Sequence, residues 1–158
     1  MKILILGAAG HGKDEFAELL KKYHGFKFTS SSLFCLDALF PVLAHVNGYG
    51  CKPEAFKDRD DNRMLWKGLI KLINYADKSA LAKLILVDND IYVGMRDNEE
   101  YLAAAPLFDI TYWIDARFRV PKIDPSLNIA FDSTSMVLIP NNGTKLELEN
   151  IVKSLKFP

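Results

Sequence analysis

The feature that most constrains the fold is a glycine-rich loop between a short apolar strand and an amphipathic helix, all within the first 20 residues. Residues 2–6 (KILIL) form a nearly continuous apolar run, which is typical of a central parallel strand covered on both faces. Residues 7–13 (GAAGHGK) match the pattern G-x-x-x-x-G-K, in which backbone N–H groups surround a polyphosphate and the lysine neutralises part of its charge. The N-terminus of the following helix also favours an anion. These residues therefore predict a phosphate-binding site.

Asp14, directly after the loop, departs from the usual form of this pattern. A serine or threonine normally stands there and lends its hydroxyl group to Mg²⁺. A carboxylate either binds the metal, directly or through water, or merely favours the helix N-terminus. The alternative to a phosphate loop is an ordinary glycine-rich turn. A dinucleotide-binding loop fits less well, because G-x-G-x-x-G is absent and Lys13 would have no role.

Length and composition indicate one globular domain spanning residues 1–158, with 49% hydrophobic residues to form its core. The 20 basic and 20 acidic residues cancel, so there is no global attraction to nucleic acid or membrane, although a local basic groove is compatible with this balance. Cys35 and Cys51 form no metal or disulfide pattern and suit a reducing compartment. The first strand leaves no room for a signal peptide, and no apolar run approaches a membrane span. We therefore expect a soluble cytoplasmic protein.

Short apolar runs alternate with helical patterns along the chain, without repeats or low-complexity segments. The expected strands are residues 2–6, 26–29, 91–95, 110–114 and 136–139. After the first helix, further helices are expected at residues 33–43, 53–75, 78–87 and 99–105, with a closing helix that contains Leu148 and Val152. Pro41 should kink or shorten its helix. This alternation predicts an α/β fold with a parallel sheet.

Polar residues follow each expected strand. In open parallel sheets, ligands bind beyond the carboxyl ends of the strands. The groups found there are the phosphate loop, residues 30–32, Arg96 and Asp97, Asp115 with Arg117 and Arg119, and residues 140–144. We therefore expect one functional site along that edge of the sheet.

Two segments besides the loop carry a resemblance to a known family. Residues 92–100 (YVGMRDNEE) form a strand that ends in an arginine, with glutamates a few residues later. Residues 136–144 (MVLIPNNGT) form a last strand followed by an N-x-G-[ST] pattern. Together with the ending Gly12-Lys13-Asp14, they make the chain resemble the P-loop nucleoside and nucleotide kinases, in particular the deoxynucleoside monophosphate kinases of bacteriophages.

This resemblance implies a three-layer α/β/α fold with a five-stranded parallel sheet in the order 2-3-1-4-5. It implies transfer of the γ-phosphoryl group of ATP to a deoxynucleoside monophosphate with Mg²⁺ and, for a phage-encoded chain, a place in the host cytoplasm. It also suggests an acceptor-binding helical region at about residues 33–75 and a short lid at about residues 116–130.

Phosphoryl transfer requires positive charge around the transferred group and exclusion of water, which suggests roles for the loop and the arginines. The residues assigned to nucleotide binding are Gly7, Ala8, Ala9, Gly10, His11, Gly12, Lys13, Asp14, Asn142 and Gly143. The residues assigned to catalysis are Lys13, Asp14, Arg96, Arg117 and Arg119, with Asp14 also assigned to Mg²⁺. The residues assigned to acceptor binding are Ser31, Arg59, Arg63, Trp66 and Arg96.

Several of these side chains also have a purely structural interpretation. Arg96 could form a surface salt bridge with Glu99 or Glu100, and the two arginines of the lid could lie in a solvated loop. Trp66 could stack on a base, but an aromatic residue on an apolar helical face more often belongs to a core. Asp115 could approach Mg²⁺ through water or cap the turn that follows it.

One position departs from the family pattern. The phage kinases usually carry D-x-R at the end of the third strand, whereas Gly94 stands where the aspartate is expected. Its role would pass to another carboxylate, such as Asp14, Asp88 or Asp90, or the acceptor differs. The main rival acceptor is the hydroxymethyl group of 5-hydroxymethyluracil in DNA, which related phage kinases phosphorylate. A nucleotide-binding regulator that transfers no phosphate is the alternative from another class.

Overall fold

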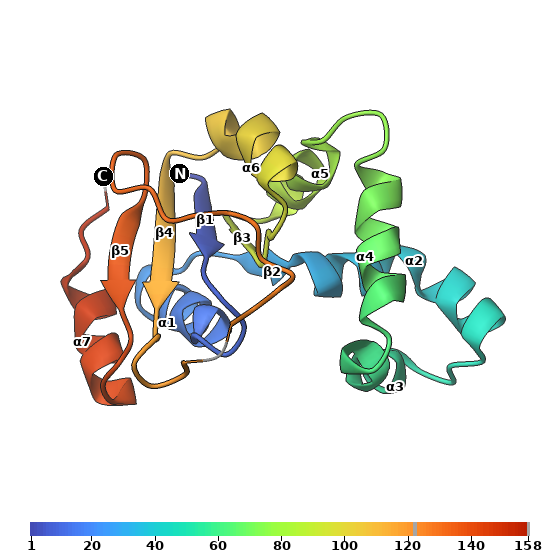
Figure 1. Ribbon diagram of the computed structural model, residues 1–158, viewed down its shortest axis with the longest axis horizontal. Coiled ribbons are helices and arrows are strands. Elements are labelled where there is room, and N and C mark those ends of the chain that lie inside the picture. The colour runs from blue at the N-terminus through green and yellow to red at the C-terminus, as the bar shows by residue number, and fades with distance from the viewer. Residues whose placement is uncertain (122, 158) are drawn as a thin grey trace.

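The structure is a computed structural model that describes residues 1–121 and 123–157, except for the side chain of Asp60. Its centre is a five-stranded sheet in the order β2-β3-β1-β4-β5, in which every neighbouring pair is parallel (Figure 1). The strands are β1 (Ile3–Leu6), β2 (Phe28–Ser30), β3 (Ile91–Val93), β4 (Ile110–Asp115) and β5 (Val137–Pro140). The predicted fold class and strand order are therefore confirmed, with strand ends shifted by one or two residues.

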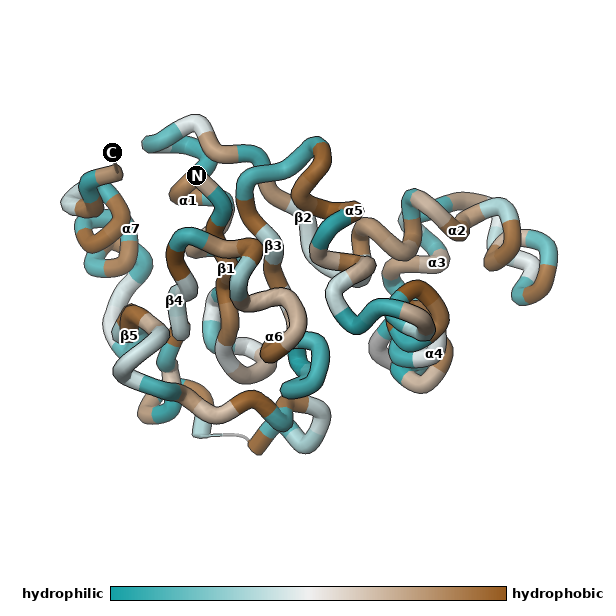
Figure 2. The backbone as a smooth tube through the Cα atoms, turned by 90° about the horizontal axis from the view of Figure 1, so that it is seen from above, coloured by the Kyte–Doolittle hydropathy of each residue, from teal (hydrophilic) through white to brown (hydrophobic). Residues whose placement is uncertain are grey.

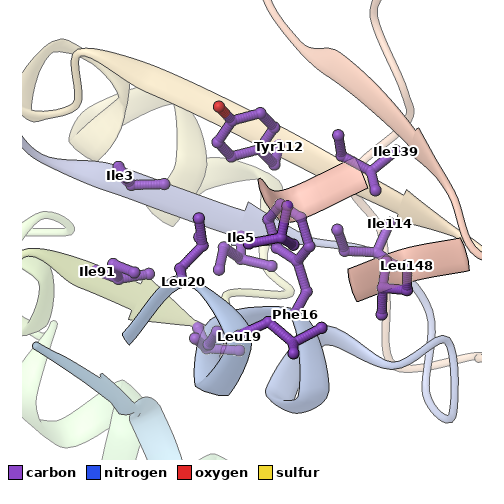
Figure 3. Packing of buried hydrophobic residues seen from close by; sticks show 13 residues of the cluster. Ile3, Ile5, Phe16, Leu19, Leu20, Ile91, Tyr112, Ile114, Ile139 and Leu148 are labelled. Atoms are coloured by element: carbon purple, nitrogen blue, oxygen red, sulfur yellow. The ribbon is translucent and has the colours of Figure 1, made fainter. Parts of the chain in front are cut away.

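Helices cover both faces of this sheet. Successive side chains of a strand point to opposite sides, so each buried strand presents apolar side chains to both layers of helices. On one face, Ile3 and Ile5 pack with Phe16 of α1 (Lys13–His24) and Leu148 of α7 (Lys145–Ser154) (Figure 3). On the other face, the alternate residues of β1 pack with α5 (Ala80–Asp88) and α6 (Asn98–Ala104). The three layers hold the carboxyl ends of the strands at a common edge.

A helical arm extends beyond β2, away from the sheet, in both views (Figures 1 and 2). Its elements are α2 (Ser31–Asn47), α3 (Lys52–Lys57), a 3₁₀ turn (Asp58–Asp60) and α4 (Arg63–Ile73). The arm has a small core of its own, formed by Cys35, Leu36, Leu43, Ala55 and Trp66. None of the described helices is long and apolar enough to cross a membrane.

The structure corrects two helix predictions in this arm. Of the two effects expected of Pro41, shortening of its helix does not occur, because α2 continues through it to Asn47. Pro41 is exposed, so the carbonyl group that loses its helical partner can bind water instead. The single helix expected at residues 53–75 is divided in two, since the Asp58 carboxylate accepts hydrogen bonds from the side chains of Tyr49 and Asn62 and fixes a turn.

Candidate functional site

The loop between β1 and α1 has the backbone that its glycines permit. Gly7, Gly10 and Gly12 all have positive φ, at 135°, 77° and 89°. At Gly7 a Cβ atom would lie 2.4 Å from the carbonyl oxygen of Ile114, so the loop packs directly against the backbone of β4. The path of the loop therefore depends on glycine at its first position.

Lys13 is the first residue of α1, and its side chain turns back over the loop. Its Nζ atom donates a hydrogen bond to the Ala8 carbonyl oxygen at 2.7 Å, and the residue is 8% exposed. Burial, and then the positive charge of Arg96, lower the pKa of Lys13 to about 8. An anion bound in the loop would relieve both effects, as the predicted role of Lys13 requires.

The loop is hydrogen-bonded to the segments after β4 and β5, two strands on the same side of β1. The His11 ring is buried, its Nδ1 accepts the Ala116 N–H at 3.1 Å, and the same atom lies 3.3 Å from the Ile114 carbonyl oxygen. The Asn141 side chain donates to the His11 carbonyl oxygen at 2.8 Å. His11 is thus a structural residue of the loop, and its ring faces β4.

Three of the residues predicted to bind the nucleotide, Gly10, Gly12 and Gly143, line a cavity of about 240 Å³ beside the loop. Its lining comprises Gly10, Gly12, Glu15, Arg119, Asn141, Gly143, Lys145 and Leu148. Arg119 reaches this cavity with its Nε donating to the Asn141 carbonyl oxygen at 3.2 Å. The side-chain oxygen of Asn142 accepts a hydrogen bond from the Phe118 N–H, and its side-chain nitrogen donates one to the Asp115 carbonyl oxygen. The structure therefore brings Arg119 and the last loop to the phosphate loop.

The Arg117 side chain binds a different partner from Arg119. Its Nε donates to the Asp115 carboxylate at 2.7 Å, and that carboxylate also accepts the Arg117 backbone N–H. Asp115 therefore caps the turn after β4, as one of its two interpretations expects. A second cavity, of about 490 Å³, lies between this turn and His11, and it includes neither Lys13 nor Arg96.

Arg96 lies at the phosphate loop, but its partner is one that the sequence did not identify. It donates to Asp124 Oδ2 and to Ser126 Oγ, both at 2.5 Å, and does not form the alternative salt bridge with Glu99 or Glu100. The same Asp124 oxygen accepts the Ala9 N–H of the loop at 2.9 Å. Asp124, Arg96 and Lys13 therefore form one charged cluster at the loop.

Two carboxylates proposed to replace the family aspartate are at the wrong edge of the sheet. Asp90 precedes β3, where it accepts the Lys27 N–H and pairs with Lys2. Asp88 ends α5 shortly before it. Both lie at the amino ends of the strands, opposite the phosphate loop, so the prediction that either one acts in the site is wrong. Asp14 lies in the first turn of α1 and is exposed.

The predicted acceptor residues are spread over the arm and its junction with the sheet. Trp66 is 4% exposed, packs edge-on against Phe56 and belongs to the core of the arm, so the structure does not support stacking of its ring on a base. Its Nε1 has no hydrogen-bond partner within the described part of the chain. Arg59 lies over the Phe56 ring at 4.6 Å, and Arg63 begins α4. Ser31 is buried at the start of α2.

A buried acid lies beneath this junction and was not predicted. Glu100 is 4% exposed, and its carboxylate accepts a hydrogen bond from the Tyr92 hydroxyl group at 2.8 Å. Burial raises the pKa of Glu100 to about 7, although hydrogen bonds from Tyr92 and Asn74 oppose the rise. The sequence offered Glu100 as a salt-bridge partner and as part of the family pattern, but one glutamate in a polar run gives no sign of burial.

This acid makes stability depend on pH. Its carboxyl group ionises near pH 4.5 in the unfolded chain but near pH 7 in the folded one, so stability is lost as the pH rises between these values. We expect wild-type protein to lose about 3 kcal/mol from this group between pH 4.5 and 8, and Glu100→Gln to remove that loss. Urea unfolding at pH 5 and pH 8 tests this, with Glu99→Gln as the exposed control. An equal pH dependence in Glu100→Gln would contradict it.

The phosphate loop between β1 and α1, with the strand order β2-β3-β1-β4-β5, defines the P-loop kinase fold. The chain is similar to the shikimate kinase from Aquifex aeolicus vf5, with a TM-score of 0.52 and 18% identity over 96% of this chain and 94% of that one. It is also similar to a gluconokinase from Sinorhizobium meliloti 1021, with a TM-score of 0.50 and 15% identity over 97% and 89%. No family model matches the sequence, and no curated protein is significantly similar to it. At these identities the likeness establishes the fold.

Proposed function

We propose that the protein is a kinase that transfers the γ-phosphoryl group of ATP in the presence of Mg²⁺. The observation that carries this proposal is the convergence of Lys13 and Arg96 on a loop in which three glycines have positive φ. Such a loop binds polyphosphate through its N–H groups and its lysine. The presence of Arg119 at the adjoining cavity supports this reading over a regulator that binds a nucleotide without transferring phosphate.

The residues present fit a nucleotide with its metal. The cavity of about 240 Å³ beside Gly12 and Gly143 suits the nucleoside part, and Lys13 suits the β- and γ-phosphates. Within the described residues, no group of three or more His, Cys, Asp or Glu side chains could hold a metal ion. Mg²⁺ needs only one or two carboxylates besides the phosphates, and the exposed Asp14 fits that role. When bound, the ion would neutralise phosphate charge.

The residues after β4 would close this site. Arg119 already lies against Asn141, whereas Arg117 would have to leave Asp115 to reach a phosphate. A lid over about residues 116–130 would exclude water and so couple closure to transfer. Arg117 and Arg119 would thus act at different stages.

The first candidate acceptor is a deoxynucleoside monophosphate, which rests on the resemblance to phage kinases. The arm, which carries Ser31, Arg59 and Arg63, would receive its nucleoside. The second candidate is the hydroxymethyl group of 5-hydroxymethyluracil in DNA. A specific observation favours this second candidate, because the Arg96 guanidinium is already paired with the Asp124 carboxylate.

The test is ADP release from Mg-ATP by the purified protein. The acceptors compared are the four deoxynucleoside monophosphates and duplex DNA that carries 5-hydroxymethyluracil, with Lys13→Ala as the blank. Turnover that requires both an acceptor and Lys13 supports the proposal and identifies the acceptor. If Lys13→Ala matches wild type with every acceptor and without one, the proposed function fails.

A further inference from the structure

The Asp124 carboxylate, in the segment after β4, lies at the phosphate loop, where a bound anion is expected. The Asp124 side chain is 3% exposed, and it comes from 115 residues beyond Ala9, whose N–H it accepts at 2.9 Å. It also interacts electrostatically with Lys13 and is paired with Arg96. A side chain so buried and so fully hydrogen-bonded has a defined position next to the site of transfer.

All four acceptor positions of this carboxylate are occupied. Oδ1 accepts the backbone N–H of Ser126 at 3.1 Å and its hydroxyl at 2.5 Å. Oδ2 accepts from Arg96 and from Ala9. The Ala9 N–H belongs to the loop, whose N–H groups donate hydrogen bonds to phosphate when a nucleotide is bound. One position on Oδ2 would then become free, directed towards the transferred group.

The charges of Asp124 and Arg96 beside the loop suit an uncharged acceptor group. The pKa of Asp124 would be raised by burial, but the hydrogen bonds from Ser126, the Arg96 charge and the Ala9 N–H outweigh this and lower it to about 2. The group is therefore negative at neutral pH and would repel an acceptor phosphate. It also compensates Arg96, which would otherwise attract that phosphate. An ionised carboxylate instead accepts a hydrogen bond from a hydroxyl group.

We propose that Asp124 is a catalytic residue that accepts the proton of an alcohol, so that the acceptor of this kinase is a hydroxyl group and not a phosphate. The inference rests on the proposed function. The alcohol oxygen forms a bond to the γ-phosphorus, the bond from that phosphorus to the β,γ-bridging oxygen breaks, and ADP leaves with the electron pair. The alcohol proton passes to Asp124 Oδ2 and then to water. Arg96 and Ser126 hold the carboxylate in place.

The competing role for Asp124 makes the opposite prediction. If it merely occupied the phosphate position in the empty protein, removing its charge would strengthen Mg-ATP binding and leave transfer as fast or faster. A general base instead contributes to the rate, typically by 10²- to 10⁴-fold. The two roles therefore separate in a variant that keeps the shape of the side chain and loses its charge.

Asp124→Asn is that variant, and Asp132→Asn is its matched control. Asp132 accepts hydrogen bonds from Thr134 and Ser135 in a similar turn of the same segment, but it is exposed. Each protein is assayed for ADP release with duplex DNA carrying 5-hydroxymethyluracil, with the four deoxynucleoside monophosphates, and with no acceptor, where water supplies the hydroxyl group. Calorimetry gives the Kd of Mg-ATP in parallel.

We expect Asp124→Asn to lower transfer to DNA, or acceptor-free hydrolysis if the DNA is not a substrate, by at least about 100-fold. Asp124→Asn should bind Mg-ATP at least as tightly as wild type, so the rate of transfer is the measurement that separates the two roles, and Asp132→Asn should match wild type in both. Transfer to a deoxynucleoside monophosphate by the wild-type protein overturns the inference, as does tighter Mg-ATP binding by Asp124→Asn with an undiminished rate. Hydrolysis that depends on Lys13 but not on Asp124 also overturns it and leaves the proposed function standing. Loss of the Lys13 dependence refutes the proposed function instead.

Discussion

Replacing Lys13 by alanine is expected to lower kcat/KM for phosphoryl transfer by at least about 10³-fold while leaving the fold intact. Lys13 is the charge that the loop presents to the β- and γ-phosphates, and removing one such group from a water-excluding site typically costs 10²- to 10³-fold in rate. The remaining loss comes from weaker binding of Mg-ATP, because its phosphates would lose their charged partner at the start of α1.

The stability of the same variant should not fall. The Lys13 ammonium is buried, and burial lowers its pKa to about 8, so the folded protein bears a cost for keeping it charged at pH 7. Its hydrogen bond to Ala8 offsets part of that cost. Urea unfolding should therefore show a free energy within about 1 kcal/mol of wild type. Lys21→Ala, an exposed change in the same helix, should leave both activity and stability unchanged.

An unfolded Lys13→Ala protein would mean that the lysine supports the fold, and retained transfer would mean that the loop is not the nucleotide site. Calorimetry with Mg-ATP separates the remaining outcomes. If binding persists while transfer is lost, Lys13 acts on the transition state alone. If both are lost, it contributes to ground-state binding as well.

Local patterns were sufficient to predict the elements that position the loop. The apolar run of β1, the glycines and the amphipathic α1 are adjacent in sequence, so their geometry follows from short-range rules. The alternation of strands with helices likewise predicted a parallel sheet. The order of the strands came from the family resemblance, since periodicity does not tell which strands are neighbours.

The residues that sequence reasoning missed depend on contacts between distant segments. The run Asp124-Pro125-Ser126 has the composition of an ordinary surface turn, and Ser126 does donate to Asp124 as such turns require. Nothing local indicates that this turn folds back onto Ala9 and Arg96. Trp66 was ambiguous for a related reason, because a helical apolar face looks the same whether it meets a core or a base.

Residues 58–62 show a second limit of sequence reasoning. They were expected to lie within one helix over residues 53–75, yet they separate α3 from α4. The Asp58 side chain competes for local hydrogen-bond donors and stops the first helix, as aspartate often does. Propensity alone does not reveal such competition, since Asp58 becomes a turn residue only when Tyr49 and Asn62 are placed to donate to it.

Replacing Gly7 by alanine is expected to destabilise the protein far more than the same change at Gly10 in the same loop. Gly7 has a φ of 135°, outside the region that alanine tolerates, and its new Cβ atom would lie 2.4 Å from the Ile114 carbonyl oxygen. That oxygen belongs to the backbone of β4, a central strand, and cannot rotate away. Strain and overpacking together should destabilise the protein by at least about 3 kcal/mol.

Gly10→Ala is the matched control within the same loop. Gly10 has a φ of 77°, and the nearest atom to its new Cβ would be a methyl group of Val120 at 3.4 Å. Only the left-handed conformation opposes that change, at a cost of about 1–2 kcal/mol. Urea unfolding of both variants should therefore rank Gly7→Ala well below Gly10→Ala, and equal stabilities would contradict the packing of the loop on β4. If Gly7→Ala still folds, its contact with β4 should displace the loop. The backbone N–H groups of the loop would then move out of position, so Mg-ATP binding should be lost.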